Sequence, residues 1–169
     1  MIAWAVLATG CGGSAPPPTA APTAPVAAAA GSGSAAPAAP GVSPVVSSDV
    51  LAREPVANVA MVKHILISWN DNADAFGGRI DPRAAKRSKA DAENEVRAIL
   101  KLLKDGGDFD ALMRERSEDT GSAQSGHEFK VTPDAGLVIE FRQLGLRLNV
   151  GEVGVVQSEF GFHIIKRFS

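Results

Sequence analysis

The sequence FGFHIIKRF at residues 160–168 is dominated by aliphatic and aromatic residues, yet it carries a histidine, His163, in its middle. A second run of the same kind, VKHILISW at residues 62–69, places His64 in a matching setting. Both runs are rich in branched aliphatic residues and predict β-strands. Because they stand far apart in the chain, they predict one domain that is opened and closed by strands.

The chain between these two runs follows helical spacing in three places. Ser88 is a candidate N-cap for a helix that runs to about residue 104, and Asp108 is a candidate N-cap for a second, shorter helix. Thr132 and Pro133 predict the start of a third helix. The apolar residues that recur at helical intervals are Ala92, Val96, Ile99, Leu100 and Leu103, then Phe109, Leu112 and Met113, and then Leu137, Phe141, Leu144 and Leu148.

The order of the expected elements favours a mixed fold. Strands are expected near residues 60–68, 128–131, 153–157 and 161–167, whereas SEDTGSAQSG at 117–126 is expected to be a loop. The order is then strand, helix, helix, strand, helix, strand, strand. We therefore predict an α+β fold, a small antiparallel four-stranded sheet covered by helices.

The first part of the chain differs in composition from the rest. The protein has 169 residues and a net charge of −2, which argues against nucleic-acid binding, and no charged residue precedes Asp49. Residues 12–48 hold eight of the eleven prolines among Ala, Gly, Ser and Thr. Such a composition buries too little apolar surface to offset the entropy of ordering. We expect a disordered tether over residues 11–56 and a folded domain over 57–169.

The first residues, MIAWAVLATGC, form a short apolar run that ends at Cys11, the single cysteine of the chain. The run is far shorter than the roughly 20 residues that a membrane-spanning helix needs. It predicts a signal peptide over residues 1–10, and LATGC resembles the lipobox of bacterial lipoproteins. That resemblance implies lipidation of Cys11 and a cell-envelope location, with the domain tethered to a membrane. The alternative is an unmodified free thiol.

Several motifs along the domain resemble the parvulin-type peptidyl-prolyl cis-trans isomerases. They are HILI at 64–67, DFDALMRERSED at 108–119, GSA at 121–123, GEV at 151–153 and FGFHIIK at 160–166, so the resemblance covers about residues 61–169. It implies a parvulin/FKBP-like fold. It also implies that His64 and His163 lie hydrogen-bonded on neighbouring strands, in the floor of a shallow pocket on the sheet face opposite the helices.

The resemblance further implies the composition of that pocket. Its polar, catalytic side is expected to be His64, Asp119, His163 and Ser158, and its apolar, substrate-binding side to be Phe129, Leu137, Phe141 and, at the rim, Phe160. Asp119 is expected to orient the histidines and to act electrostatically. No nucleophile is needed, since rotation about a peptide bond breaks no bond.

Each of these residues has a simpler alternative role. The two histidines can be ordinary buried residues, Asp119 can close a turn, and the aromatic residues can belong to the core. A metal site built from His64, His163 and Asp119 is conceivable by ligand type, but the local spacing does not call for one, and we expect no cofactor.

The sequence departs from the family pattern in one loop. GHEFK at residues 126–130 replaces two glycines that are usual there, and His127 or Lys130 is expected to require a rearranged turn. Two functions therefore stay open. The first is an active prolyl isomerase that acts, as a monomer, on proline-containing segments of exported proteins. The second is a parvulin-fold chaperone or binding module with little or no activity.

Overall fold

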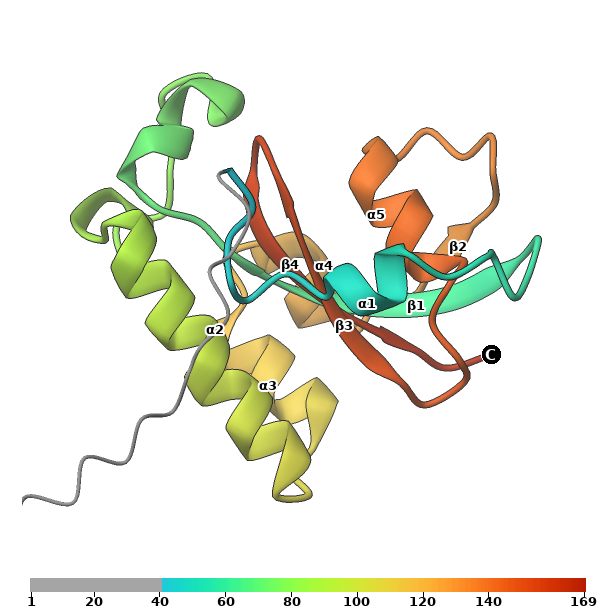
Figure 1. Cartoon of the computed structure of the whole chain (residues 1–169). Coiled ribbons are helices and arrows are strands. Elements are labelled where there is room, and N and C mark those ends of the chain that lie inside the picture. The colour runs from blue at the N-terminus through green and yellow to red at the C-terminus, as the bar shows by residue number, and fades with distance from the viewer. Residues whose placement is uncertain (1–40) are drawn as a thin grey trace, which may run out of the picture. The chain divides into compact units, whose positions relative to one another are not determined.

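The computed structural model describes residues 41–169 and contains one four-stranded sheet (Figure 1). The strands are β1 (Ala60–Ile67), β2 (Phe129–Val131), β3 (Val153–Ser158) and β4 (Gly161–Arg167). They lie in the order β2-β1-β4-β3, and every neighbouring pair is antiparallel. The predicted α+β fold is confirmed, and each strand lies within a residue or so of its expected place.

The register between the two central strands brings the histidines together. His64 on β1 stands opposite Ile165, and His163 on β4 stands opposite Leu66. The two histidines are therefore diagonal neighbours on one face of the sheet, close enough for their side chains to meet.

Two helices cover the other face of the sheet (Figure 1). α2 (Lys89–Lys104) follows the N-cap Ser88, whose hydroxyl accepts a hydrogen bond from the Asp91 amide. α3 (Phe109–Arg116) follows the N-cap Asp108, whose carboxylate accepts a hydrogen bond from the Ala111 amide. Both caps and both helices match the sequence prediction. The apolar sides of these helices pack on alternate residues of the central strands, including Ile65, Ile67, Phe162 and Ile164.

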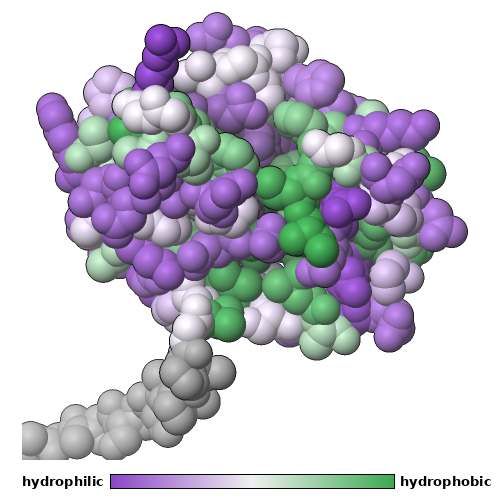
Figure 2. Space-filling view, turned by 90° about the horizontal axis from the view of Figure 1, so that it is seen from above, coloured by the Kyte–Doolittle hydropathy of each residue, from purple (hydrophilic) through white to green (hydrophobic). Residues whose placement is uncertain are grey.

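The histidine face lies opposite α2 and α3, as expected, but it is not free of helices. α5 (Ile139–Gly145) and the short α1 (Ser48–Leu51) pack on it in a second core cluster. Val62, Val156 and Ile165 make this face apolar, so a helix is needed to cover it. In the view from above, a band of hydrophobic surface lies between hydrophilic regions (Figure 2).

Two helical segments differ from the sequence prediction. The expected loop at 117–126 contains α4 (Thr120–Ser125), which Asp119 caps at its N-terminus and Gly126 ends with a left-handed φ of 67°. The third helix, α5, starts at Ile139 and not near residue 132, because Thr132 closes a turn through the hydrogen bond from its hydroxyl to Asp134.

The long loop after β1 holds two 3₁₀ segments, η1 (Asn70–Phe76) and η2 (Ala84–Lys86).

The segment that precedes β1 is packed against the domain from residue 41 onward. Val45 and Val50 are 7% and 3% exposed. Ser47 exchanges hydrogen bonds with Val155, its amide donating to the Val155 carbonyl at 2.9 Å and its hydroxyl accepting from the Val155 amide at 3.0 Å. For residues 41–56 the expectation of a disordered tether is therefore wrong, because these contacts satisfy part of the edge of β3 and bury two valines.

The earlier part of the expected tether, the signal peptide and Cys11 lie outside the described residues. Within residues 41–169, no helix has the length and apolar character required to cross a bilayer.

Candidate functional site

The site is centred on the two histidines that the β1–β4 register brings together. His64 Nδ1 lies 3.1 Å from His163 Nδ1, and each residue is only 5% exposed. The two rings are nearly parallel, with an interplanar angle of 16°. Two ring nitrogens at hydrogen-bonding distance require one to carry a proton and the other to accept it.

Asp119 contacts Nε2 of His64, the outer ring nitrogen, which is the one that does not face His163. Its Oδ2 lies 2.9 Å from His64 Nε2, and the Ser122 hydroxyl donates to the same oxygen at 2.6 Å. The hydrogen bond from His64, followed by those from Ser122, lowers the pKa of the Asp119 carboxyl well below its usual range, although partial burial opposes the shift. Asp119 is therefore an ionised acceptor at neutral pH, which fixes the proton on His64 Nε2.

Ser158 holds the outer nitrogen of His163. Its Oγ lies 2.7 Å from His163 Nε2, and it accepts a hydrogen bond from the Phe160 amide at 3.1 Å. Burial, reinforced by the neighbouring His64, lowers the pKa of His163 to about 3. His163 is therefore neutral at pH 7, and one of its two ring nitrogens is an acceptor.

These bonds assign a direction to the whole chain of side chains. Ser158 donates to His163 Nε2, His163 Nδ1 donates to His64 Nδ1, and His64 Nε2 donates to Asp119. Every ring nitrogen has a partner in this arrangement. The carboxylate at one end accepts from His64 Nε2, and where His64 carries this single ring proton its Nδ1 is an acceptor, which sets the direction of the remaining bonds.

A cavity of about 410 Å³ opens over the histidines. Its lining residues are His64, Leu66, Phe76, Glu118, Asp119, Thr120, Phe129, Gly136, Leu137, Val138, Phe141, Phe160 and His163. The rings of Phe129 and Phe141 stand edge-on to the His64 ring, with centroids 5.1 and 5.2 Å away. An apolar cup thus directly adjoins a polar, charged chain of side chains.

The structure places seven of the eight expected site residues around this cavity. The exception is Ser158, which lies behind His163 and does not line it. Phe141 lines the cavity and is also a core residue, only 3% exposed. The cavity position and the core position, which were given as alternatives, are therefore both observed. The individual catalytic and binding roles of these residues remain predictions.

Several residues of the site were not predicted from the sequence, and Ser122 and Phe76 are two of them. Ser122 bonds the Asp119 carboxylate from the first turn of α4, and the Asp-x-x-Ser spacing of an N-terminal cap was a signal for it. Phe76 lines the cavity and meets Phe160 edge-on at 5.4 Å between ring centroids. It comes from an irregular loop, and no periodic pattern pointed to it.

The altered loop at 126–130 is accommodated without strain. Gly126 takes the left-handed conformation, whereas no other residue type in the described range 41–169 has a positive φ. His127 and Lys130 therefore do not adopt a positive φ, and the rearranged turn expected from the sequence stays a prediction. In the same range, no group of three or more His, Cys, Asp or Glu side chains is placed to hold a metal ion.

The fold and the site together define a rotamase domain. Residues 48–168 match the family model of the PPIC-type PPIase domain. The chain therefore belongs to the parvulin-type peptidyl-prolyl cis-trans isomerase family, and its folded part is a domain of that type.

Individual relatives agree with this family. The foldase protein PrsA of Oceanobacillus iheyensis is 39% identical over 108 residues, which are 63% of this chain and 36% of PrsA. The periplasmic chaperone PpiD of Escherichia coli K12 is 38% identical over 74 residues, which are 44% of this chain and 12% of PpiD. The PPIase domain of TbPar42 superposes with a TM-score of 0.51 at 26% identity, over 65% of this chain and 99% of that domain. The chain thus matches well under half the length of these curated relatives.

Proposed function

We propose that this protein catalyses cis–trans isomerisation of X-Pro peptide bonds. The observation that carries the proposal is the apolar cup of Phe129, Leu137 and Phe141 directly beside the Asp119–His64–His163–Ser158 chain. The cup suits a proline ring. With the ring bound there, the peptide group that precedes the proline lies beside the carboxylate and the imidazoles.

The chemistry asked of this site is modest. The barrier of about 18–20 kcal/mol arises from the partial double-bond character of the C–N bond, and no covalent bond has to break. A site that binds the twisted amide more tightly than the planar one is sufficient. The planar amide places partial negative charge on its carbonyl oxygen, so the ionised Asp119 at the cavity wall disfavours that form. The apolar lining strengthens this effect by excluding water.

Turnover tests the proposal directly. A protease-coupled assay on short X-Pro peptides is expected to show a rate that rises in proportion to the concentration of the purified protein. An isomerisation rate equal to that of the uncatalysed peptide at all concentrations contradicts the proposal.

A second role, holding of unfolded chains, is favoured by the relatives' names of foldase and periplasmic chaperone. The exposed Ile139, at 54%, and the open cavity supply apolar surface for it. Suppression of aggregation of an unfolded client by an isomerase-deficient Asp119→Asn variant measures this role separately from turnover. Loss of both activities in this variant argues against an independent chaperone function.

The setting of the domain is also a proposal. We infer a lipid anchor at Cys11 that holds the domain at a membrane of the cell envelope, with proline-containing segments of exported proteins as substrates. A Cys11→Ala variant is expected to move from the membrane fraction to the soluble fraction. Unchanged fractionation contradicts the anchor. We also expect a monomer, which sedimentation of the purified protein tests.

A further inference from the structure

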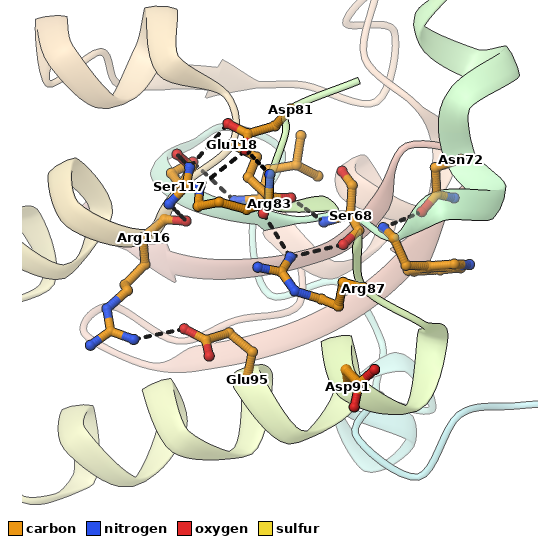
Figure 3. A network of polar contacts seen from close by, with 12 residues as sticks. Ser68, Asn72, Asp81, Arg83, Arg87, Asp91, Glu95, Arg116, Ser117 and Glu118 are labelled. Atoms are coloured by element: carbon orange, nitrogen blue, oxygen red, sulfur yellow. Dashed lines mark hydrogen bonds and ion pairs between the residues drawn. The ribbon is translucent and has the colours of Figure 1, made fainter. Parts of the chain in front are cut away.

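A buried ion pair between Arg87 and Glu118 takes no part in the histidine chain, although Glu118 adjoins the cavity. Figure 3 shows this pair and its bond to Ser68. Arg87 Nη1 is 2.6 Å from Glu118 Oε1, and the Glu118 side chain is only 1% exposed. Burial raises the pKa of the Glu118 carboxyl, while the bonds from Ser68 and Arg87 oppose that shift. Glu118 precedes Asp119 in the chain, and its amide donates to the Leu66 carbonyl at 2.9 Å.

The pair binds both backbone groups of one residue, Ser68. The Ser68 amide donates to Glu118 Oε2 at 2.6 Å, and Arg87 Nη1 donates to the Ser68 carbonyl at 2.9 Å. β1 ends at Ile67, so these two groups have no partner on a neighbouring strand. Ser68 is 1% exposed, and buried backbone groups need hydrogen-bond partners. The ion pair therefore fixes the position of Ser68.

Ser68 in turn holds the turn between β3 and β4. Its hydroxyl donates to the Phe160 carbonyl at 2.6 Å, and the Phe160 amide donates to Ser158, the anchor of His163. A parallel bond runs from the Asn72 side chain to the Glu159 carbonyl at 2.7 Å. The Phe160 ring forms one wall of the cavity. A continuous path thus leads from the buried ion pair to the cavity rim and to the far end of the histidine chain.

We propose that Glu118 and Arg87 are positioning residues of the isomerase site, acting through Ser68 on Phe160 and Ser158. This inference rests on the proposed isomerase function. The side chains of Arg87 and Glu118 are only 15% and 1% exposed, so the pair acts on the rim ring and on the anchor of His163 through Ser68. Burying two charges is costly, and such pairs often contribute little net stability, so a geometric role accounts better for this one.

A second ion pair in the same network provides the matched control. Arg116 Nη1 lies 2.8 Å from Glu95 Oε1 and ties α3 to α2, and the two side chains are 36% and 28% exposed (Figure 3). Neither residue lines the cavity. Glu95→Gln and Glu118→Gln make the same chemical change, so a difference between them reports on position.

The test is a double-mutant cycle on kcat/KM. Glu118→Gln and Ser68→Ala are each expected to lower kcat/KM by about tenfold or more, since small misplacements of reacting groups are costly, and Glu95→Gln is expected to leave it unchanged. Because Glu118 acts through Ser68, the double variant should lose no more than the larger single loss. If the double variant loses the product of the two single losses, the proposal is wrong. It is also wrong if kcat/KM of Glu118→Gln equals that of Glu95→Gln.

Two further measurements keep the test decisive. If Glu118→Gln fails to fold, Arg87→Lys retains a donor for Ser68 and should keep most activity, whereas Arg87→Met should lose it. In 15N NMR spectra, Ser68→Ala and Glu118→Gln should shift the Phe160 amide and the His163 ring signals, and Glu95→Gln should not. These shifts are read without turnover, so an inactive wild type refutes the proposed function alone, while unshifted signals refute the positioning role.

Discussion

His64 Nδ1 and His163 Nδ1 face each other across two neighbouring strands at 3.1 Å, so the two imidazoles share a single proton between them. Their tautomers are therefore coupled: a proton on one facing nitrogen excludes a proton on the other. Asp119 and Ser158 occupy the two outer nitrogens and decide which arrangement exists. The electrostatics of the cavity floor thus depend on residues from three separate parts of the chain.

Removing the charge at Asp119 should reduce catalysis while leaving the fold intact. Asn caps a helix as well as Asp does, so Asp119→Asn should preserve α4. It loses a charged hydrogen bond, which contributes about 1.5–3 kcal/mol, so kcat/KM should fall by roughly tenfold to a hundredfold. Asp110→Asn, which alters an ion pair with Lys63 at 3.0 Å away from the cavity, is the control. Equal activities of the two variants contradict a role for the carboxylate.

Stability should fall as the pH drops through the weakly acidic range. His163 has a pKa of about 3 in the folded protein, below the value of about 6.5 for a free histidine, so the unfolded chain binds more protons between these limits. Its contribution is complete above the unfolded pKa and is lost toward pH 3, with a slope of up to about 1.4 kcal/mol per pH unit. Denaturation midpoints at a series of pH values measure the slope. His163→Gln should flatten it, and the exposed His127→Gln should not.

Leu137→Ala should affect activity without affecting stability, whereas Phe141→Ala should affect both. Leu137 is partly buried and lines the cavity, so Leu137→Ala should lower kcat/KM with little change in denaturation midpoint. Phe141 is 3% exposed within the second core cluster, and Phe141→Ala should cost about 3–5 kcal/mol of stability as well as activity. A Leu137→Ala variant with unchanged kcat/KM places the proline ring elsewhere.

Removal of residues 41–56 should destabilise the domain. Val45 and Val50 are buried, and full burial of a valine contributes about 1.5–3 kcal/mol. A chain that starts at residue 57 is therefore expected to unfold at a lower denaturant concentration than one that starts at residue 41, by a few kcal/mol. Coincident unfolding curves for the two chains show instead that this segment contributes nothing to the core.

Phosphate before proline should give no advantage. Arg87 is paired with Glu118, and Arg83 with Asp81 at 3.1 Å, so neither guanidinium is free to clamp a dianion. Asp119 also lines the cavity, and its ionised carboxylate repels a phosphate. We expect kcat/KM for a phosphoserine-proline peptide to be no higher than for its alanine-proline counterpart. A preference of about tenfold that Arg79→Ala abolishes contradicts this reading.

Local patterns were sufficient for most of the fold. β1, β4, α2 and α3 follow from side-chain periodicity and from the caps at Ser88 and Asp108, all of which act within a few residues of sequence. The resemblance to parvulins, carried by short motifs in order, added the site residues, and the structure brings them together around one cavity.

The features that the sequence predicted wrongly are set by turns and by contacts with distant parts of the chain. The start of α5 is set by a turn at Thr132, and the packing of residues 41–56 depends on the edge of β3, which lies far along the chain. Val45 and Val50 stand in or beside an Ala- and Pro-rich segment whose composition predicts disorder, and only contact with the sheet reverses that prediction.

The sequence by itself therefore determined the elements, the family and the two histidines, because these depend on residue type and short-range spacing. Tertiary structure alone decided which side chains bond the two histidines, the position of Phe76 at the cavity rim and the hydrogen bonds from the Glu118–Arg87 pair to Ser68. Each of these depends on distances of a few ångströms between residues that are distant in sequence. Strand register and burial set such distances, and no local pattern encodes them.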